Sequence, residues 1–549
     1  MRIASAAAWP LKGFYAAMLL GSAAVAGMLA TNGGAEAAQA PAPAGTIPLG
    51  PTPPSDIASP AGPQQAAVFA WQEFIALTWP AKPNPTPGSS GYYRGQPDLT
   101  ATSGSTGPDG LTVWETFYHR TELYPGYATG AGNVLPDPDA PPSYLYGTPP
   151  VKATPTTALN LFNNMDEASE IGLALMYYTP LAQKADALRA QYPNPTPAQQ
   201  QQINAAAVAA GLVYEAKGNR VMFDYLKETG FNNPVPRRKA RAQTVALINN
   251  NKVTGPTFLL PNGTTEIKAT WRHYNQGVDD LSKFHWRKGI YYTAGATPSA
   301  PPVANNGILL LVGLHIIQKT PSFPTFTFAT FEHVSNEANG FRFTNTNPGT
   351  CVPGKCGIAV PRVLPDPGVI EAKRQFPIPA SLAAFNTAVQ NQLRSQYGQN
   401  NVWANYQLIG VQSAVQNDPG GPVPAQQFFL SNFATESNNT LQYFQGALGG
   451  PSGNIPNPNQ PSVRKKNATG KYAAYSAGGC VGCHGAAGQV AGGDFSVISS
   501  GQNMLGIEPA TPYPGGKVTL QNGAGFPLAH QAQFMPAGKA APDRNKKGK

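Results

Sequence analysis

The sequence predicts an α+β protein, in which a large β-rich antiparallel domain with peripheral helices and long loops precedes a short, mainly helical or irregular C-terminal segment. Glycine and proline number 58 and 56 among 549 residues and only 12% of the residues are charged, which favours loops and strands over a helical bundle. Several segments have the apolar pattern of strands, whereas few have that of helices. No repeat is visible, which disfavours a propeller or a solenoid.

Residues 1–40 have the composition of a secretory signal peptide. Arg2 and Lys12 give a basic start, and an apolar run from Phe14 to Ala30 leads to small residues suited to cleavage. The mature chain is therefore expected to be exported to the periplasm without a membrane anchor. A retained anchor is the less favoured alternative, because the run is shorter than the ~20 residues that a membrane span requires.

The rest of the chain divides by composition into five parts. They are a Pro/Ala-rich linker at 41–62, the β-rich domain at 63–446, a Gly/Pro/Asn-rich linker at 447–470, the C-terminal segment at 471–540 and a basic tail at 541–549. The first linker is expected to be solvated. The basic residues form small scattered clusters without interleaved aromatic residues, so no nucleic-acid partner is predicted.

Two helical regions are predicted in the first half of the domain. A helix at 64–77 is indicated by apolar residues that share one helical face, Val68, Trp71 and Ile75. The proline-rich stretch that follows, to about residue 158, is expected to be mostly loop. A second helical tract begins after Thr196, with Pro197 at its first position, and is predicted to continue through Val213–Gly230.

The next region has the pattern of strands. Asn262-Gly263 is a hairpin turn signal, and apolar and polar residues alternate in Ile267–Arg272, so one face of that strand is expected to be buried and the other wet. Gly307–Lys319 is apolar on both faces, as in a central strand. Phe326–Val334 is expected to return and pair with it.

A helix and a strand are predicted to complete the domain. Ser381 caps the helix and Gly398 ends it. Its apolar stripe consists of Leu382, Phe385, Val389 and Leu393. Val402–Gln412 is predicted to be a further strand.

The domain contains candidate metal ligands of its own. His315, Glu332 and His333 lie on the two strands that are expected to pair, and two histidines with a carboxylate could bind a transition metal. The strand register decides which of them meet: opposite Ala329, His315 shares a face with His333, and opposite Phe328 it shares a face with Glu332. The favoured interpretation is that these polar residues have hydrogen-bond partners within or beside the sheet. Two further candidates precede these strands, His119 and Glu122.

The four cysteines form two pairs, of which the first predicts a disulfide. Cys351 and Cys356 flank Pro353-Gly354, which favours a type II turn that brings both thiols close together. In an oxidising compartment such a pair is expected to be oxidised. A metal pair is the alternative, but no neighbouring His or Cys completes a four-ligand site.

The second pair predicts a covalent haem. Cys480, Cys483 and His484 form Cys-Val-Gly-Cys-His, the attachment motif of a c-type haem. Residues three apart share a face of a helical turn, so both thiols can reach one edge of a porphyrin while His484 faces its iron. A redox disulfide between the two cysteines is the alternative, and it would need no histidine. One haem c is therefore expected.

At this motif the chain resembles the cytochrome c family, over its C-terminal segment only. The resemblance implies thioether bonds at Cys480 and Cys483, His484 as the proximal iron ligand, and the transfer of single electrons. It also implies a second axial ligand, and Met535 is the first choice because its Met-Pro pair is similar to the sixth-ligand segment of many monohaem cytochromes c. The alternatives are, in order, Met504, His530, and an upstream His or an open position.

The leading hypothesis is an exported electron carrier whose large domain is a scaffold or docking surface. Lys465, Lys466 and Lys471 precede the motif and could steer an acidic redox partner. The first alternative is a haem-dependent oxidoreductase, which acts on a small substrate at an open haem or at a second site in the β-rich domain. The second is a structural or sensory haem protein of the cell envelope.

Overall fold

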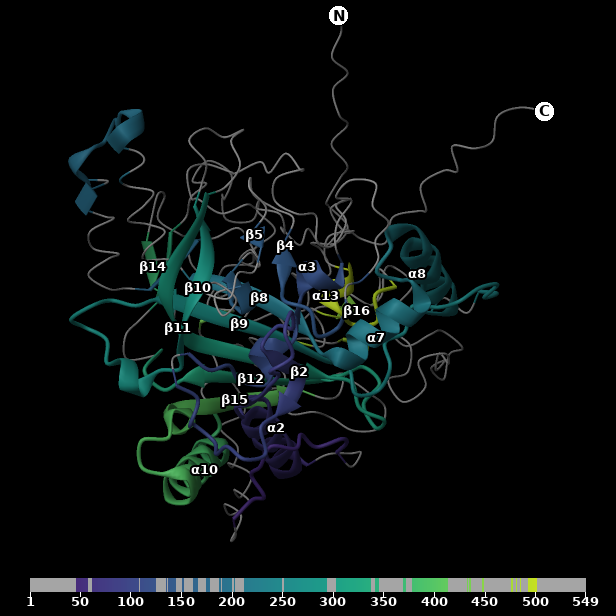
Figure 1. Ribbon diagram of the computed structural model, residues 1–549, viewed down its shortest axis with the longest axis horizontal. Coiled ribbons are helices and arrows are strands. Elements are labelled where there is room, and N and C mark those ends of the chain that lie inside the picture. The colour runs from purple at the N-terminus through teal and green to yellow at the C-terminus, as the bar shows by residue number, and fades with distance from the viewer. Residues whose placement is uncertain are drawn as a thin grey trace, which may run out of the picture.

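A computed structural model shows the arrangement of most of the predicted domain and of a small part of the C-terminal segment. The structure describes residues 46–57, 62–107, 109–124, 135, 137–144, 151–152, 161–165, 174–177, 187–188, 190–199, 202, 212–248, 251–293, 303–336, 341–344, 369–371, 378–412, 432, 434–435, 447–448, 475–476, 480, 484 and 492–500. The fold is a mixed α+β structure in which one large sheet is the central element (Figure 1).

The central sheet has eight strands and curls into a nearly closed, barrel-like form. Its strands are β3 (Tyr118–His119), β6 (Asn164–Met165), β8 (Leu212–Gly218), β9 (Thr265–His273), β10 (Trp286–Thr293), β11 (Val303–Gln318), β12 (Thr327–His333) and β15 (Tyr406–Gln412). They follow the order β15-β12-β11-β9-β8-β3, with β10 on β11 and β6 on β10. All of these pairs are antiparallel except β6–β10, which is parallel, so the sheet is mixed and not purely antiparallel as expected.

Strand β11 is the centre of the sheet, as the sequence predicts. Leu309 and Leu310 are in register with both β9 and β10, so β10 lies on the edge of β11 that faces away from β9. Gly313 pairs with β9 on one side and with β12 on the other. Strand β12 therefore pairs with the same edge of β11 as β10 does, but further along β11. The predicted pairing of β11 with β12 is confirmed, and the two strands are antiparallel.

Helices and small sheets surround the central sheet. The helices are α2 (Pro63–Leu77), α3 (Arg120–Leu123), α7 (Arg220–Thr229), α8 (Pro234–Ile248), α10 (Ala380–Tyr397) and α13 (Val497–Ser500), with 3-10 turns at Trp114–Thr116, Leu281–Lys283 and Val402–Asn405. The small sheets pair β1 (Ala81–Pro83) with β2 (Tyr92–Pro97), β4 (Ser143–Tyr144) with β5 (Val151–Lys152), β7 (Ala174–Tyr177) and β14 (Val369–Glu371) with β13 (Phe341–Thr344), and β16 (Ala447–Leu448) with β17 (Tyr475–Ser476). Within the described ranges, no helix combines the length and apolar character that a membrane span requires.

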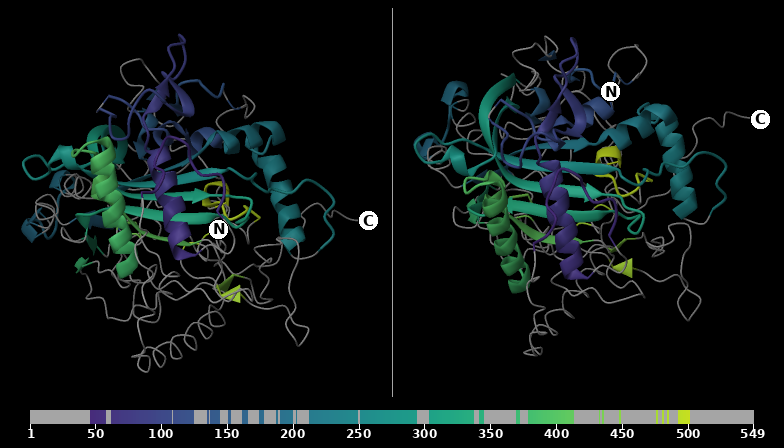
Figure 2. Two further views of the ribbon diagram at one scale, coloured as in Figure 1. Left: turned by 90° about the horizontal axis from the view of Figure 1, so that it is seen from below. Right: turned by 60° about the horizontal axis from the view of Figure 1, so that its bottom comes forward.

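The first face of the sheet is covered by α2 and α10, which lie side by side across the strands (Figure 2). The predicted stripe of α10 packs there, with only Leu382 half-buried, and Gly398 ends that helix with a φ of 104°. Ser381 does not cap the helix, because the helix begins one residue before it and has no side-chain cap hydrogen bond. On α2, Phe74 stacks on Phe331 of β12 at a centroid distance of 4.2 Å and meets Trp403 edge-on at 5.6 Å. Burial of these rings makes the first face the larger apolar core.

Three predictions in the sheet are wrong. Val213–Gly230 does not continue a helix, because its first part is strand β8 and Asn219 then caps α7 by accepting a hydrogen bond from the backbone N–H of Met222. Strand β9 has no solvent-exposed face, because its residues are buried on both sides of the sheet, apart from the half-buried Lys268 and His273. The turn at Gly263 is present, with a φ of 87°, but the residues before it form no strand.

Residues 46–57 are attached to the domain, although they belong to the segment that was expected to be a solvated linker. The Ile47 N–H donates to Gln392 Oε1 at 3.0 Å, and Gln392 Nε2 donates back to the Ile47 carbonyl at 2.7 Å. Ile47 and Leu49 are buried in the larger core. Residues 46–57 are therefore fixed to α10, and we call them the N-terminal strap.

Candidate functional site

The described residues of the cysteine–histidine motif lie on the second face of the sheet. Glu266 of β9, Ile317 of β11 and Phe328 of β12 form one cross-strand row on that face. The imidazole of His484 lies against Phe328, with ring centroids 4.8 Å apart. Cys480 is half-buried and packs against the same apolar cluster as Phe328. The two motif residues are thus at one place on the sheet.

Residues 492–500, which we call the C-terminal strap, fix the surroundings of His484. Phe495 and Ile498 are buried in the cluster that also contains Phe328 and residues of α7 and α8. The hydroxyls of Tyr124 and Ser499 are 2.5 Å apart. Gly492 lies so close to α8 that an added Cβ would clash with a carbonyl of that helix. The C-terminal strap is therefore packed into the domain.

A hydrogen bond to the C-terminal strap determines the tautomer of His484. Its Nδ1 lies 2.9 Å from the carbonyl oxygen of Phe495. A carbonyl oxygen can only accept, so Nδ1 carries the proton, and in the neutral ring the lone pair is on Nε2. This is the tautomer in which a histidine can bind a metal through Nε2. His484 therefore fits the role of a haem-iron ligand.

The backbone of the C-terminal strap is anchored by a buried ion pair. Lys319 Nζ lies 2.5 Å from Asp494 Oδ2, and both side chains are less than one-tenth exposed. The same oxygen accepts a hydrogen bond from the Leu260 backbone N–H at 2.7 Å. Burial raises the pKa of Asp494, while the Lys319 charge opposes that rise. Asp494 thus joins the strap to the loop before β9 and to the end of β11.

Glu266 is a second buried carboxyl at this place. Burial raises its pKa to about 8, the Asp494 carboxylate adds to the rise, and a hydrogen bond with Ser496 opposes it. Its side chain is therefore neutral at pH 7. The sequence suggests none of this, because Glu266 occupies a polar position of an alternating strand and reads there as solvent-exposed.

The histidines on β11 and β12 do not form the metal site that was considered. His315 is in register with Thr330, which places it on the face of Phe328 and Glu332 and not on that of His333. His333 Nε2 donates to the Lys283 carbonyl at 3.1 Å, and its Nδ1 lies 2.7 Å from Ser335 Oγ. Its burial lowers the pKa of His333 to about 4. His333 is thus a neutral structural histidine, in agreement with the favoured interpretation.

The earlier candidates also have structural partners. The Glu122 carboxylate binds Arg94 through two hydrogen bonds, of 2.9 and 3.2 Å, and accepts a third from the backbone N–H of His119 at 2.9 Å. Its capacity as a metal ligand is therefore largely used. Over all residues that the structure describes, no group of three or more His, Cys, Asp and Glu is arranged to hold a metal ion.

Several predicted site residues lie outside the described residues. They are Cys351, Cys356, Cys483, Met504, His530 and Met535, together with Lys465, Lys466, Lys471 and the signal peptide at 1–40. The haem attachment, the sixth ligand and the disulfide therefore stay predictions.

A buried cluster of charged side chains on the first face was not predicted. Glu115 is fully buried, and it accepts from Arg287 Nε at 2.8 Å and from Arg287 Nη2 at 3.1 Å. Burial would raise the pKa of Glu115, but Arg287 and the adjacent His285 hold it well below its usual value. Lys217 lies 3.4 Å from Glu215, which accepts a hydrogen bond from Trp271 Nε1. The local sequence gives one indication of this cluster: the charged residues Glu215 and Lys217 are two positions apart in β8 and so lie on the same face of the strand.

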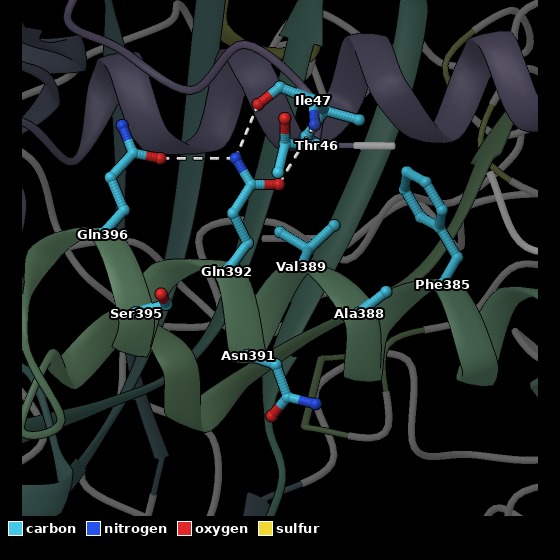
Figure 3. A pocket seen from close by; sticks show the side chains of 9 residues that line it. All are labelled: Thr46, Ile47, Phe385, Ala388, Val389, Asn391, Gln392, Ser395 and Gln396. Atoms are coloured by element: carbon cyan, nitrogen blue, oxygen red, sulfur yellow. Dashed lines mark hydrogen bonds between the residues drawn. The ribbon is translucent and has the colours of Figure 1, made fainter. Parts of the chain in front are cut away.

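The pocket beside α10 is lined by apolar, hydroxyl and amide side chains. It lies between α10 and the N-terminal strap (Figure 3). Figure 3 shows Gln392 joined to Ile47 and to Gln396 by hydrogen bonds. The lining contains no acid, base or cysteine: it consists of Thr46, Ile47, Phe385, Ala388, Val389, Asn391, Gln392, Ser395 and Gln396.

Comparisons with family models, curated proteins and solved structures find no match to this chain. The chemistry of the motif and the geometry around His484 are therefore what a functional proposal can use.

Proposed function

We propose that the chain is an exported monohaem c-type cytochrome, which transfers single electrons through one covalently bound haem. The Cys-Val-Gly-Cys-His motif supports the proposal, and the hydrogen bond from His484 Nδ1 to the Phe495 carbonyl carries it. Histidines that bind a metal usually donate their other N–H to a carbonyl or a carboxylate, which fixes the ring and its tautomer. In the proposal, Cys480 and Cys483 form the thioether bonds and His484 is the proximal ligand.

The haem, when bound, supplies an iron that alternates between the ferric and ferrous states. The chain's own residues would hold the imidazole still and keep water from it. Phe328 packs against the His484 ring, and the buried Phe495 supplies the carbonyl that holds its proton. Met535 is proposed as the sixth ligand, with Met504 as second choice, and a methionine there would raise the reduction potential relative to a histidine.

The surroundings of the electron transfer follow from the same proposal. The signal peptide at 1–40 would direct the chain to the periplasm, where Cys351 and Cys356 would form a disulfide. The lysines at 465, 466 and 471 would attract an acidic redox partner.

Covalent haem attachment tests the proposal directly. The full chain would be expressed in bacterial cells that attach haem to exported proteins, and the denatured polypeptide would be separated and stained for haem. We expect haem on the wild type and on the control variant Cys351→Ser, and none on the double variant Cys480→Ser, Cys483→Ser. A wild-type polypeptide without haem, in cells that load another c-type cytochrome, would contradict the proposal.

A haem-dependent oxidoreductase is the second candidate, and the size of the sheet domain favours it because an electron carrier needs far fewer residues. Carbon monoxide separates the two functions. A ferrous spectrum that carbon monoxide leaves unchanged indicates an iron with two protein ligands, as in an electron carrier. Binding of carbon monoxide would indicate an open position and support the oxidoreductase.

A further inference from the structure

The backbone that presents the Phe495 carbonyl to His484 has an unfavourable conformation. Asp494 has a φ of 56° and Phe495 a φ of 64°, so two consecutive residues other than glycine are in the left-handed region. Each such residue costs roughly 1–2 kcal/mol relative to a right-handed conformation. Strain of this kind persists only where surrounding contacts fix it, and it is concentrated at functional sites.

The contacts that fix this conformation come from the sheet domain. The Asp494 carboxylate is held by Lys319 Nζ at 2.5 Å and by the Leu260 N–H at 2.7 Å. The position of Lys319 is itself set by two backbone hydrogen bonds, since its N–H donates to Thr264 and its carbonyl accepts from Gly263. Phe495 adds a ring that is only 1% exposed. The residue after the central strand β11 and the loop before β9 thus determine the direction of the Phe495 carbonyl.

We propose that the Lys319–Asp494 ion pair is a positioning device for His484, through which the sheet domain controls the properties of the iron ligand. The inference rests on the proposed haem-binding function, which it deepens. Lys319 and Asp494 touch neither His484 nor the haem in this proposal; they hold the strap so that the Phe495 carbonyl accepts the Nδ1 proton. A histidine that keeps this hydrogen bond is a more basic ligand and stabilises ferric iron.

The inference also gives the sheet domain a purpose. Lys319 directly follows the central strand β11, which ends at Gln318, and the ion pair joins residues 175 positions apart in the sequence. The C-terminal segment alone lacks Lys319 and the Leu260 N–H, and so could not hold the strap in this conformation. The large domain is therefore a part of the haem site and not only a docking surface.

Two measurements on the full chain test the inference, with the variants Asp494→Asn and Lys319→Met. The first is the side-chain ¹⁵N NMR spectrum of His484, taken on the protein without haem. We expect the Nδ1–H tautomer in the wild type and a mixture of tautomers in both variants. The second is the reduction potential of the haem-loaded protein. We expect it to be about 59 mV higher in both variants than in the wild type, which corresponds to a tenfold change in the equilibrium constant for one electron.

Two further variants serve as controls. Lys319→Arg keeps the charge and is expected to retain the wild-type tautomer and potential. Lys283→Met breaks an exposed Lys–Asp pair, with Nζ 3.8 Å from Asp280, and is expected to change neither quantity. If Lys319→Met does not fold, Asp494→Asn still decides, because asparagine can accept the Leu260 N–H while it lacks the charge.

The inference is overturned if Asp494→Asn, or a folded Lys319→Met, keeps both the Nδ1–H tautomer and the wild-type potential. Failure of the underlying function gives a different result, since the wild type would then acquire no haem. In that case the tautomer measurement alone decides whether the ion pair positions His484.

Discussion

The buried carboxyl of Glu266 predicts an unusual pH dependence of stability. Burial raises the pKa of Glu266 from 4.5 to about 8. Between these values the folded chain holds a proton that the unfolded chain has released, so the free energy of unfolding decreases as the pH rises. The contribution is complete below pH 4.5 and is lost as the pH rises through 8.

Glu266→Gln removes this dependence, because the amide has the shape of the protonated carboxyl and does not titrate. The decrease in the wild type is about 1.4 kcal/mol per pH unit within this window, or about 3 kcal/mol from pH 4.5 to pH 7. We therefore expect the unfolding free energy of the wild type, minus that of the variant, to fall by about this amount over the same interval.

Urea unfolding, followed by tryptophan fluorescence at several pH values from 4.5 to 8, measures this difference. The exposed Glu228 provides the matched control, and Glu228→Gln is expected to leave the pH dependence of the wild type in place. A difference between wild type and Glu266→Gln that stays constant over the whole range would refute the reasoning, since Glu266 would then be ionised in the folded protein at neutral pH.

Three further predictions concern the packing of the sheet domain and of the C-terminal strap. Arg287→Met leaves the buried Glu115 carboxylate without its main partner, and should lower the free energy of unfolding in urea by about 3–5 kcal/mol. The decrease should be smaller in the double variant with Glu115→Gln, and an equal decrease in the double variant would contradict this prediction. Phe74→Ala should cost about 3–5 kcal/mol, because its fully buried ring fills the space between α2 and β12, and a loss below about 1 kcal/mol would show that the core closes over the cavity. Gly492→Ala should accelerate hydrogen exchange in the C-terminal strap, because a Cβ there clashes with α8 and the φ is 79°; Gly50→Ala, with no atom within 4 Å of its added Cβ, should leave that exchange unchanged.

The elements that local patterns specify could be predicted from the sequence. The stripe of α10, its end at Gly398 and the pairing of β11 with β12 all depend on residues close together in the chain. A capping box at Thr196 and Gln199 is also present, with hydrogen bonds of 2.9 and 3.4 Å.

The elements that depend on distant partners could not be predicted. Glu266 looks solvent-exposed in its own strand, but the C-terminal strap, more than two hundred residues later, covers it. In β8, Glu215 and Lys217 are buried because Trp271 and a carbonyl of the Glu115 turn satisfy them, so the strand lacks the alternation of apolar and polar residues that would identify it. The motif of the candidate site was visible in the sequence, whereas the role of Phe495 depends on tertiary structure.

The N-terminal strap, residues 46–57, has a consequence for the order of folding. Ile47 leaves the ribosome early, but its partner Gln392 is 345 residues further along the chain. Closing a loop ten times longer than a local one of about 35 residues costs roughly 2 kcal/mol more in chain entropy. Residues 46–57 can therefore bind only after α10 has formed. During synthesis, the face that Ile47 and Leu49 later cover stays accessible to solvent and to chaperones.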